Sequence, residues 1–209
     1  DVPVIAHANY LDVITRRKEE IQGQIASWER KQGIQRAEPF TLPRPDRTFV
    51  TEMNLDVGSL TLQIKHAPGH APDQLVVYEP ESAVLWAADM LSDLEIPLVS
   101  HSLAAYQRTL DMLAALDIHT LIPGHGTPTQ DRAEIQRRLE EDRTYLDELH
   151  RRIRSVIAAG RTLDDVAHCA DVIFRHPEEN ATAHRRNVES AYVELGGRVE
   201  DPAVGWGAG

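Results

Sequence analysis

Three side chains that commonly bind metal ions lie at turns in the middle of the chain. His70 follows a Pro-Gly pair after the apolar run 60–64, Asp89 follows the apolar run 83–87, and His125 follows a second Pro-Gly pair. Because strands that end in turns place polar residues along one rim of a fold, we expect these three side chains to converge. Two imidazoles and one carboxylate form a ligand set that suits zinc, iron or manganese.

Three further polar residues lie close to these turns and are candidates for an additional ligand or a substrate contact. His66 ends the run that precedes His70, and it could instead be a packing or orienting residue, since ligand imidazoles need oriented partners. Asp73 could cap a helix or close a turn, and His101 could cap the helix expected after it or lie at the surface. Each of the three therefore has both a functional and a structural interpretation.

The pattern of apolar residues predicts the strands and the helix that position these side chains. Segments 48–56 and 60–64 are expected to pair around an Asp-Val-Gly-Ser turn, and segments 75–78 and 84–87 around a Glu-Pro-Glu-Ser turn. A last strand is expected at 119–122. Four residues that follow Ser102 share one face of a predicted helix: Leu103, Tyr106, Leu110 and Leu113.

The first 47 residues are predicted to form a short strand, a helix and a loop. Residues 2–6 are a strand candidate, His7 is expected to be a hydrogen-bonding residue at the following turn, and Asn9 is a candidate helix cap. Segment 33–47 holds three prolines and predicts a surface loop. Four apolar residues recur at helical spacing and predict a single stripe: Ile14, Ile21, Ile25 and Trp28.

After residue 129 the chain becomes rich in charge, and helices are expected. Residues 130–159 carry apolar residues on one side and end at Gly160, which is typical of a helix C-terminus. Thr162 and Asp165 resemble a capping box for a second helix, which is expected to include Ile173. A third helix is expected before the glycine-rich end of the chain.

The composition is that of one globular core with an appended subdomain. With 209 residues, 42% of them hydrophobic, we expect a domain of residues 1–130, a helical extension of residues 131–200 packed on it, and a frayed tail of residues 201–209. A net charge of −11 argues against a nucleic-acid partner. No apolar run approaches the ~20 residues needed to span a bilayer. The single cysteine, Cys169, fits a reducing compartment, and we expect a cytoplasmic protein with a small-molecule substrate.

The motifs HAPGHAPDQLVVY, AAD and IPGHG, in that order and spacing, resemble the second half of the metallo-β-lactamase superfamily, in its glyoxalase II and lactonase-like branch. The resemblance covers roughly residues 1–130. It implies that His70, Asp89 and His125 are metal ligands, with Asp89 in the place of the bridging carboxylate that orients the nucleophilic water. It also implies an α/β fold related to an αββα sandwich.

One signature of the superfamily is absent from this sequence. The motif His-x-His-x-Asp-His supplies four further ligands, whereas His7 is the only histidine before residue 66. We therefore interpret the chain as the C-terminal half of the αββα sandwich with a C-terminal helical extension, lacking the N-terminal third. One divalent ion per site is expected rather than two, with zinc as the expected ion and manganese or iron as alternatives. A homodimer is expected to cover the exposed sheet face.

These expectations favour a metal-dependent hydrolase. It would use a metal-activated water on activated ester, lactone or phosphoester bonds, phosphotriesters included. Two alternatives remain open: a non-catalytic remnant or assembly subunit of the superfamily, and a clipped portion of a full-length dinuclear hydrolase. Metal content distinguishes the enzyme from the first alternative, and an intact mass compared with the encoding gene tests the second.

Overall fold

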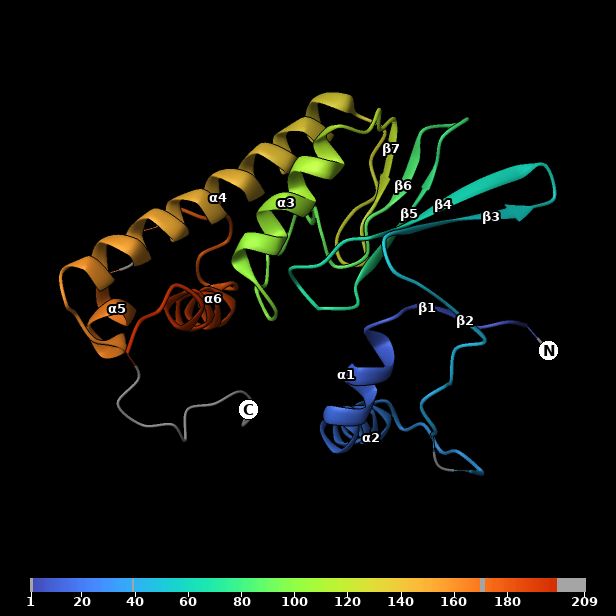
Figure 1. Ribbon diagram of the computed structural model, residues 1–209, viewed down its shortest axis with the longest axis horizontal. Coiled ribbons are helices and arrows are strands. Elements are labelled where there is room, and N and C mark those ends of the chain that lie inside the picture. The colour runs from blue at the N-terminus through green and yellow to red at the C-terminus, as the bar shows by residue number, and fades with distance from the viewer. Residues whose placement is uncertain (1, 39, 170–171, 199–209) are drawn as a thin grey trace.

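The chain folds into a mixed α/β structure built on a five-stranded sheet (Figure 1). The computed structural model describes residues 2–38, 40–169 and 172–198. The strand order is β3-β4-β5-β6-β7, with antiparallel pairing from β3 to β6 and parallel pairing between β6 and β7. The strands are β3 (Glu52–Val57), β4 (Leu60–His66), β5 (Leu75–Glu79), β6 (Val84–Trp86) and β7 (Thr120–Ile122).

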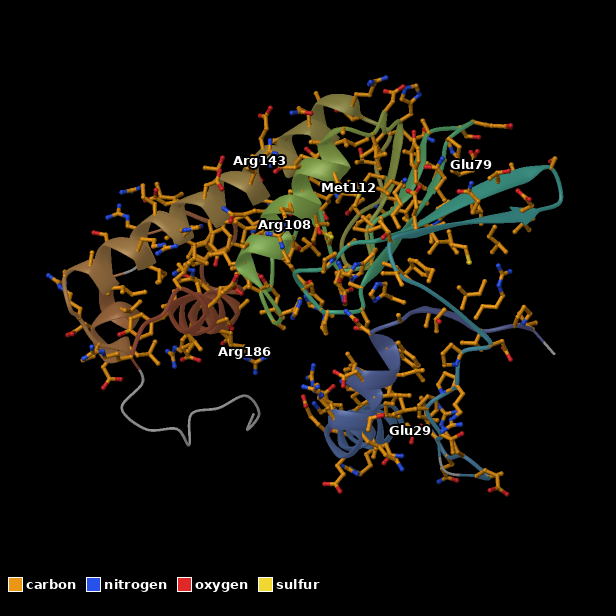
Figure 2. The ribbon with its side chains drawn as sticks, viewed as in Figure 1. Glu29, Glu79, Arg108, Met112, Arg143 and Arg186 are labelled. Atoms are coloured by element: carbon orange, nitrogen blue, oxygen red, sulfur yellow. The ribbon has the colours of Figure 1, made fainter. Side chains whose placement is uncertain are left out.

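Both predicted strand pairs are confirmed, but the segment expected as one strand at 48–56 is divided: residues 47–49 belong to a separate strand, and only β3 pairs with β4. β3 and β4 pair up to Val57 and Leu60, and Gly58 at the turn has a φ of 65°, which glycine adopts without strain. β5 and β6 pair up to Glu79 and Val84. The Glu79 carboxylate accepts the backbone N–H groups of Glu81 and Ser82 and so closes this second turn, at the tip of the hairpin in Figure 2.

Helices α3 (Leu103–Ala114), α4 (Arg132–Ala158) and α6 (Ala181–Glu194) lie together on one side of the sheet (Figure 1). Ser102 caps α3 by accepting the N–H of Ala105. The predicted face of α3 is buried and packs in the same core as the alternate residues Val76, Leu85 and Leu121 of the sheet. This side of the sheet therefore carries the hydrophobic core.

The opposite side of the sheet is apolar and partly exposed. The strand register places Met53, Leu55, Leu62, Val77 and Trp86 on this side, which we call the open sheet face. Trp86 is 40% exposed, and the other four are only partly buried. In the part of the chain that the structure describes, the helices of the core lie on the other side of the sheet (Figure 1).

The N-terminal segment differs from the prediction in two respects. The expected single helix is divided at Arg17 into α1 (Tyr10–Arg16) and α2 (Lys18–Gln32), and neither helix buries a residue, with Trp28 61% exposed. The apolar residues of these two helices therefore do not pack into the core. Asn9 makes no side-chain cap, because its amide donates to the carbonyl of Pro72 instead.

The start of the chain is held by a small sheet of its own. β1 (Ile5–His7) pairs in parallel with β2 (Arg47–Phe49), which follows the predicted loop. The strand expected at residues 2–6 is thus shifted toward His7. The ring of His7 is buried, its Nε2 donates to the carbonyl of Val50, and its Nδ1 accepts the N–H of Asn9. The predicted hydrogen-bonding role of His7 is confirmed.

The C-terminal helices match the sequence pattern except that the second of them ends earlier than expected. α4 is capped by Asp131 and is followed by Gly160 with a φ of 67°, as expected of a C-terminal glycine. Thr162 and Asp165 form the predicted cap of α5 (Leu163–Cys169). Ile173 was expected in this helix but lies beyond it and is 94% exposed, because its neighbours Val172 and Phe174 turn inward onto the core.

The third predicted helix is α6, and it is confirmed. The predicted frayed tail, residues 201–209, lies outside the described residues. Nothing tests the domain boundaries, which stay predictions. Among the helices that the structure describes, none is long and apolar enough to cross a membrane.

Candidate metal centre

Asp89 lies between His70 and His125. The Nε2 atom of His70 is 3.4 Å from Oδ2 of Asp89, and the Nε2 atom of His125 is 3.4 Å from Oδ1. The side chain of His70 is 22% exposed, against 43% for Asp89 and 58% for His125. The structure thus brings the three side chains together at a rim that opens to solvent on the His125 side, and their role as metal ligands stays a prediction.

The turn that carries His70 is docked on the N-terminus of α3. Gly69 has a φ of 142°, and a Cβ there would lie 2.5 Å from Cα and Cβ of Tyr106. The hydroxyl of Thr109 donates to the carbonyl of Pro68. The carbonyl of Gly69 accepts the backbone N–H groups of His101 and Ser102, just before α3. The Pro-Gly pair therefore sets the position of His70 by packing as well as by turn geometry.

The turns that carry Asp89 and His125 contact each other directly. The N–H of Gly124 donates to the carbonyl of Ala88 at 2.7 Å, and a Cβ on Gly124 would lie 2.9 Å from Oδ1 of Asp89. Ala88 has a φ of 49° and Leu91 a φ of 57°, so the backbone is strained on both sides of Asp89. Such strain is often found at functional sites.

The orientation of His70 is set by a backbone carbonyl. Its Nδ1 is 3.1 Å from the carbonyl oxygen of Leu98. A carbonyl can only accept a hydrogen bond, so Nδ1 carries a proton, and in the neutral imidazole Nε2 is the unprotonated nitrogen that faces Asp89. A histidine that donates through one ring nitrogen to a carbonyl is the usual arrangement of a metal-binding imidazole.

These donors fit a zinc-like ion by their chemistry. Two imidazole nitrogens face opposite oxygens of one carboxylate, and one of the imidazoles is held in the tautomer that a ligand needs. Among the residues described, however, no three His, Cys, Asp or Glu side chains are already gathered as a group that could hold an ion. Each imidazole lies near Asp89, and to bind one ion the three side chains would have to move toward a common point.

The first additional candidate, His66, contacts the N-terminal segment of the chain. The ring of His66 stacks on that of His7 with centroids 3.6 Å apart, and its Nε2 donates to the carbonyl of Pro72. Burial lowers the pKa of His66, and the nearby His7 and His101 add to this effect. The contacts observed for His66 are those of its structural interpretation.

Asp73 lies near the N-terminal segment, and His101 lies beside the turn that carries His70. The charge of Asp73 acts on Tyr10 of α1, whose pKa is raised first by burial and then by this carboxylate. His101 is exposed, and its backbone N–H donates to the carbonyl of Gly69. Roles for these two residues as ligands or substrate contacts stay predictions.

Two residues near the site were missed in the sequence. Glu95 has Oε1 4.0 Å from Nδ1 of His125. Asp93 has its Oδ1 bound to the N–H of Thr127, and only 22% of its side chain is exposed. Burial by itself would raise the pKa of Asp93, but the hydrogen bonds from Thr127 outweigh it and the net pKa is lowered. Asp93 therefore joins the loop after Asp89 to the loop after His125.

Arg138 joins the same two loops from α4. Its side chain is 2% exposed, and its guanidinium donates to the carbonyls of Leu91 and Thr127. The signal in the sequence is an arginine three residues after Ile135, on the buried side of a helix. A cation on an apolar stripe indicates a fixed partner, although it does not say which one.

The chain belongs to the metallo-β-lactamase superfamily, whose family model matches residues 1–125. A linear primary-alkylsulfatase from Pseudomonas sp. (strain ATCC 19151) is 27% identical over 134 residues, which cover 60% of this chain and 25% of the relative. A type 2 metallo-β-lactamase from Bacteroides fragilis is 27% identical over 109 residues, or 49% of this chain and 44% of the relative. The chain therefore matches less than half the length of these curated relatives.

Solved structures confirm the fold. A double mutant of the sec-alkyl sulfatase PisA1 matches 97% of this chain and 38% of its own with a TM-score of 0.70 at 18% identity. A metallo-β-lactamase family protein from Thermus thermophilus matches 93% of this chain and 66% of its own with a TM-score of 0.61 at 21% identity. The predicted α/β metallo-β-lactamase fold is thus confirmed, and the match extends over the helices beyond residue 125.

Proposed function

We propose that the chain supplies the metal-binding rim of a metal-dependent hydrolase. The observation that carries this proposal is the position of Asp89 between two imidazoles, each Nε2 facing a different carboxylate oxygen. Membership of the metallo-β-lactamase superfamily supports it, because relatives of this chain bear the names alkylsulfatase and metallo-β-lactamase.

In this proposal His70, Asp89 and His125 hold one divalent ion, with zinc as the expected ion and manganese or iron as alternatives. When bound, such an ion would polarise a substrate oxygen and lower the pKa of a nearby water toward neutrality. The Asp89 carboxylate accepts a hydrogen bond from the attacking water and orients it. The exposure of His125 leaves one side of the site open to a substrate.

The substrate class we propose is an activated ester-type bond: carboxylic esters, lactones and phosphoesters, including phosphotriesters. Sulfate esters join this set because two relatives are named as alkylsulfatases. All of these substrates place a polarisable oxygen next to the bond that is cleaved, which is what a Lewis acid beside a general base requires. The open rim favours substrates with a good leaving group, since few enclosing residues are available to strain a poor one.

The test is hydrolysis of a panel of aryl esters, a lactone, an aryl phosphotriester and an aryl sulfate, before and after chelation and after zinc is restored. We expect activity that chelation abolishes and zinc restores, and that Asp89→Ala removes. Asp117→Ala is the matched control, because Asp117 also faces an imidazole, that of His119 at 3.1 Å, but lies outside the site. Activity that survives chelation, or that Asp89→Ala leaves unchanged, contradicts the proposal.

The alternative function is a non-catalytic assembly subunit. The open sheet face favours it, because contiguous exposed apolar residues mark interaction surfaces. In this case the protein binds no stoichiometric metal, and chelation changes neither its stability nor its association. Tight zinc at about one ion per chain excludes this alternative.

A further inference from the structure

The loop between Asp89 and α3 is held by side chains of α4, α6 and the segment that precedes α6. Residues 91–99, which we call the ligand loop, form no helix or strand. Arg138 and Arg175 donate to the carbonyls at its start, those of Leu91 and Ser92. Two asparagines hold the rest of the loop, Asn180 at its middle and Asn187 at its end.

Asn187 is fully buried, and both ends of its amide are used. Its Oδ1 accepts the N–H of Val99 at 2.7 Å, and its Nδ2 donates to the carbonyl of Pro97 at 2.6 Å. Nδ2 also donates to the hydroxyl of Tyr145 at 2.9 Å. Figure 2 shows its neighbour Arg186 on the outer side of α6, whereas Asn187 is directed into the core.

The N–H of Val99 belongs to the same peptide group as the carbonyl of Leu98. A peptide group is planar and trans, so its N–H and C=O point in opposite directions. Asn187 holds the N–H on one side of this group, and Nδ1 of His70 lies 3.1 Å from the carbonyl oxygen on the other side. One rigid peptide group thus connects the amide of Asn187 to the imidazole of His70.

We propose that Asn187 is a positioning residue for His70, acting through the Leu98–Val99 peptide. By fixing the N–H, Asn187 aims the Leu98 carbonyl at Nδ1, and this keeps the Nε2 lone pair directed at Asp89. A hydrogen bond to the N–H also strengthens the carbonyl as an acceptor, because linked hydrogen bonds polarise one another. The inference rests on the proposed role of His70 as a ligand, but the orientation of the ring can be measured without metal or substrate.

Asn180 provides the control that distinguishes a purely structural role of Asn187 from the proposed positioning of His70. Asn180, the residue just before α6, is 5% exposed and makes the same pair of contacts with the ligand loop: its Oδ1 accepts the N–H of Ile96 and its Nδ2 donates to the carbonyl of Leu94. These contacts do not involve the Leu98–Val99 peptide. Asn180→Ala therefore removes an equivalent clamp and leaves the peptide that holds His70 in place.

The experiment reads the tautomer of His70 from histidine nitrogen chemical shifts in the metal-free, ¹⁵N-labelled protein, well above the ordinary imidazole pKa of about 6.5. The parent is expected to show the Nδ1–H tautomer. Asn187→Ala is expected to give a mixture of tautomers, whereas Asn180→Ala keeps the parent spectrum. Zinc affinity is expected to fall about tenfold in Asn187→Ala, as is common when a residue that orients a ligand is lost, and less than about twofold in Asn180→Ala.

Several results overturn the inference. If neutral His70 in the parent is the Nε2–H tautomer, the connection does not exist, whatever the variants show. If Asn187→Ala and Asn180→Ala change the tautomer and the zinc affinity equally, Asn187 acts only through folding. If neither variant changes them, Asn187 does not position His70. If Asn187→Ala does not fold, Asn187→Ser is measured in its place, since it keeps a small polar group but is too short to hold both loop contacts. An inactive protein with the expected tautomers counts against the hydrolase and not against this role of Asn187.

Discussion

A Cβ atom on Gly124 would lie 2.9 Å from Oδ1 of Asp89, the carboxylate that both imidazoles face. The turn that carries His125 therefore needs a glycine at position 124, beside the carboxylate of Asp89. Gly124→Ala is expected to displace Asp89 and to lower zinc affinity at least tenfold, measured by titration with a competing chelator. Gly23→Ala is the control, because nothing lies within 4 Å of the added Cβ and the position is helical, so it should raise stability by up to ~1 kcal/mol and leave zinc binding unchanged. Parent-like affinity in Gly124→Ala would show that the carboxylate position does not matter for binding.

Arg138 is expected to be important for stability as well as for the site. Arg138→Met removes the donors to the carbonyls of Leu91 and Thr127 and leaves buried acceptors without partners, at a cost of about 2–4 kcal/mol in the free energy of unfolding. Arg137→Met is the matched control one residue earlier, where the guanidinium is 51% exposed and pairs with Glu134 and Glu141. There we expect a change within ~1 kcal/mol. Both variants are measured by urea unfolding. Equal decreases in the free energy of unfolding would show that the buried contacts of Arg138 stabilise the fold no more than the exposed ion pairs of Arg137.

Stability should depend on pH through His66. Burial lowers the pKa of its imidazole in the folded protein, so below the ordinary imidazole pKa of about 6.5 the unfolded chain binds a proton that the folded chain resists. The stabilising effect is therefore present above about pH 6.5 and is lost as the pH falls through the folded pKa. His66→Gln should flatten this part of the curve in unfolding experiments between about pH 7 and 5. The same slope in parent and variant would assign the pH dependence to another group.

The open sheet face predicts a homodimer. Burying on the order of 1,000 Å² of apolar surface at ~25 cal/mol per Å² gives a gross gain of tens of kcal/mol, which is sufficient to offset the cost of association. Trp86→Lys on this face should shift the sedimentation coefficient toward that of a 23.4 kDa monomer. Trp28→Lys on α2, which is 61% exposed but lies off the sheet, should not. A folded parent that is monomeric at micromolar concentration contradicts the prediction.

The strands and turns could be predicted from the sequence because they depend on local signals. The Pro-Gly pairs before His70 and His125 mark turns at strand ends, and the alternation of apolar residues defines β4 and β5. The helix pattern around Ile21 was misleading, because the apolar residues of α1 and α2 satisfy helical spacing without any buried partner in the described structure. Periodicity indicates that a face exists but not that something packs on it.

The supports of the site could not be predicted in the same way. Asn187 acts on a peptide group 88 residues away and Arg138 on a carbonyl 47 residues away. In the sequence both are polar residues within helices, and polar helical residues are more often solvated. Only the fold brings their side chains to the ligand loop. His66 illustrates the opposite error, since its type and place suggest a ligand, but its ring is stacked on His7.

The central claim is that His70, Asp89 and His125 bind the same ion. The most direct test is the zinc stoichiometry and the zinc X-ray absorption spectrum of the zinc-loaded parent and of Asp89→Ala, with Asp117→Ala as the control. We expect about one zinc per chain, with imidazole and carboxylate donors at ~2.0–2.2 Å in the parent and the control, and loss of most zinc in Asp89→Ala. Full zinc occupancy with an unchanged spectrum in Asp89→Ala would contradict the claim.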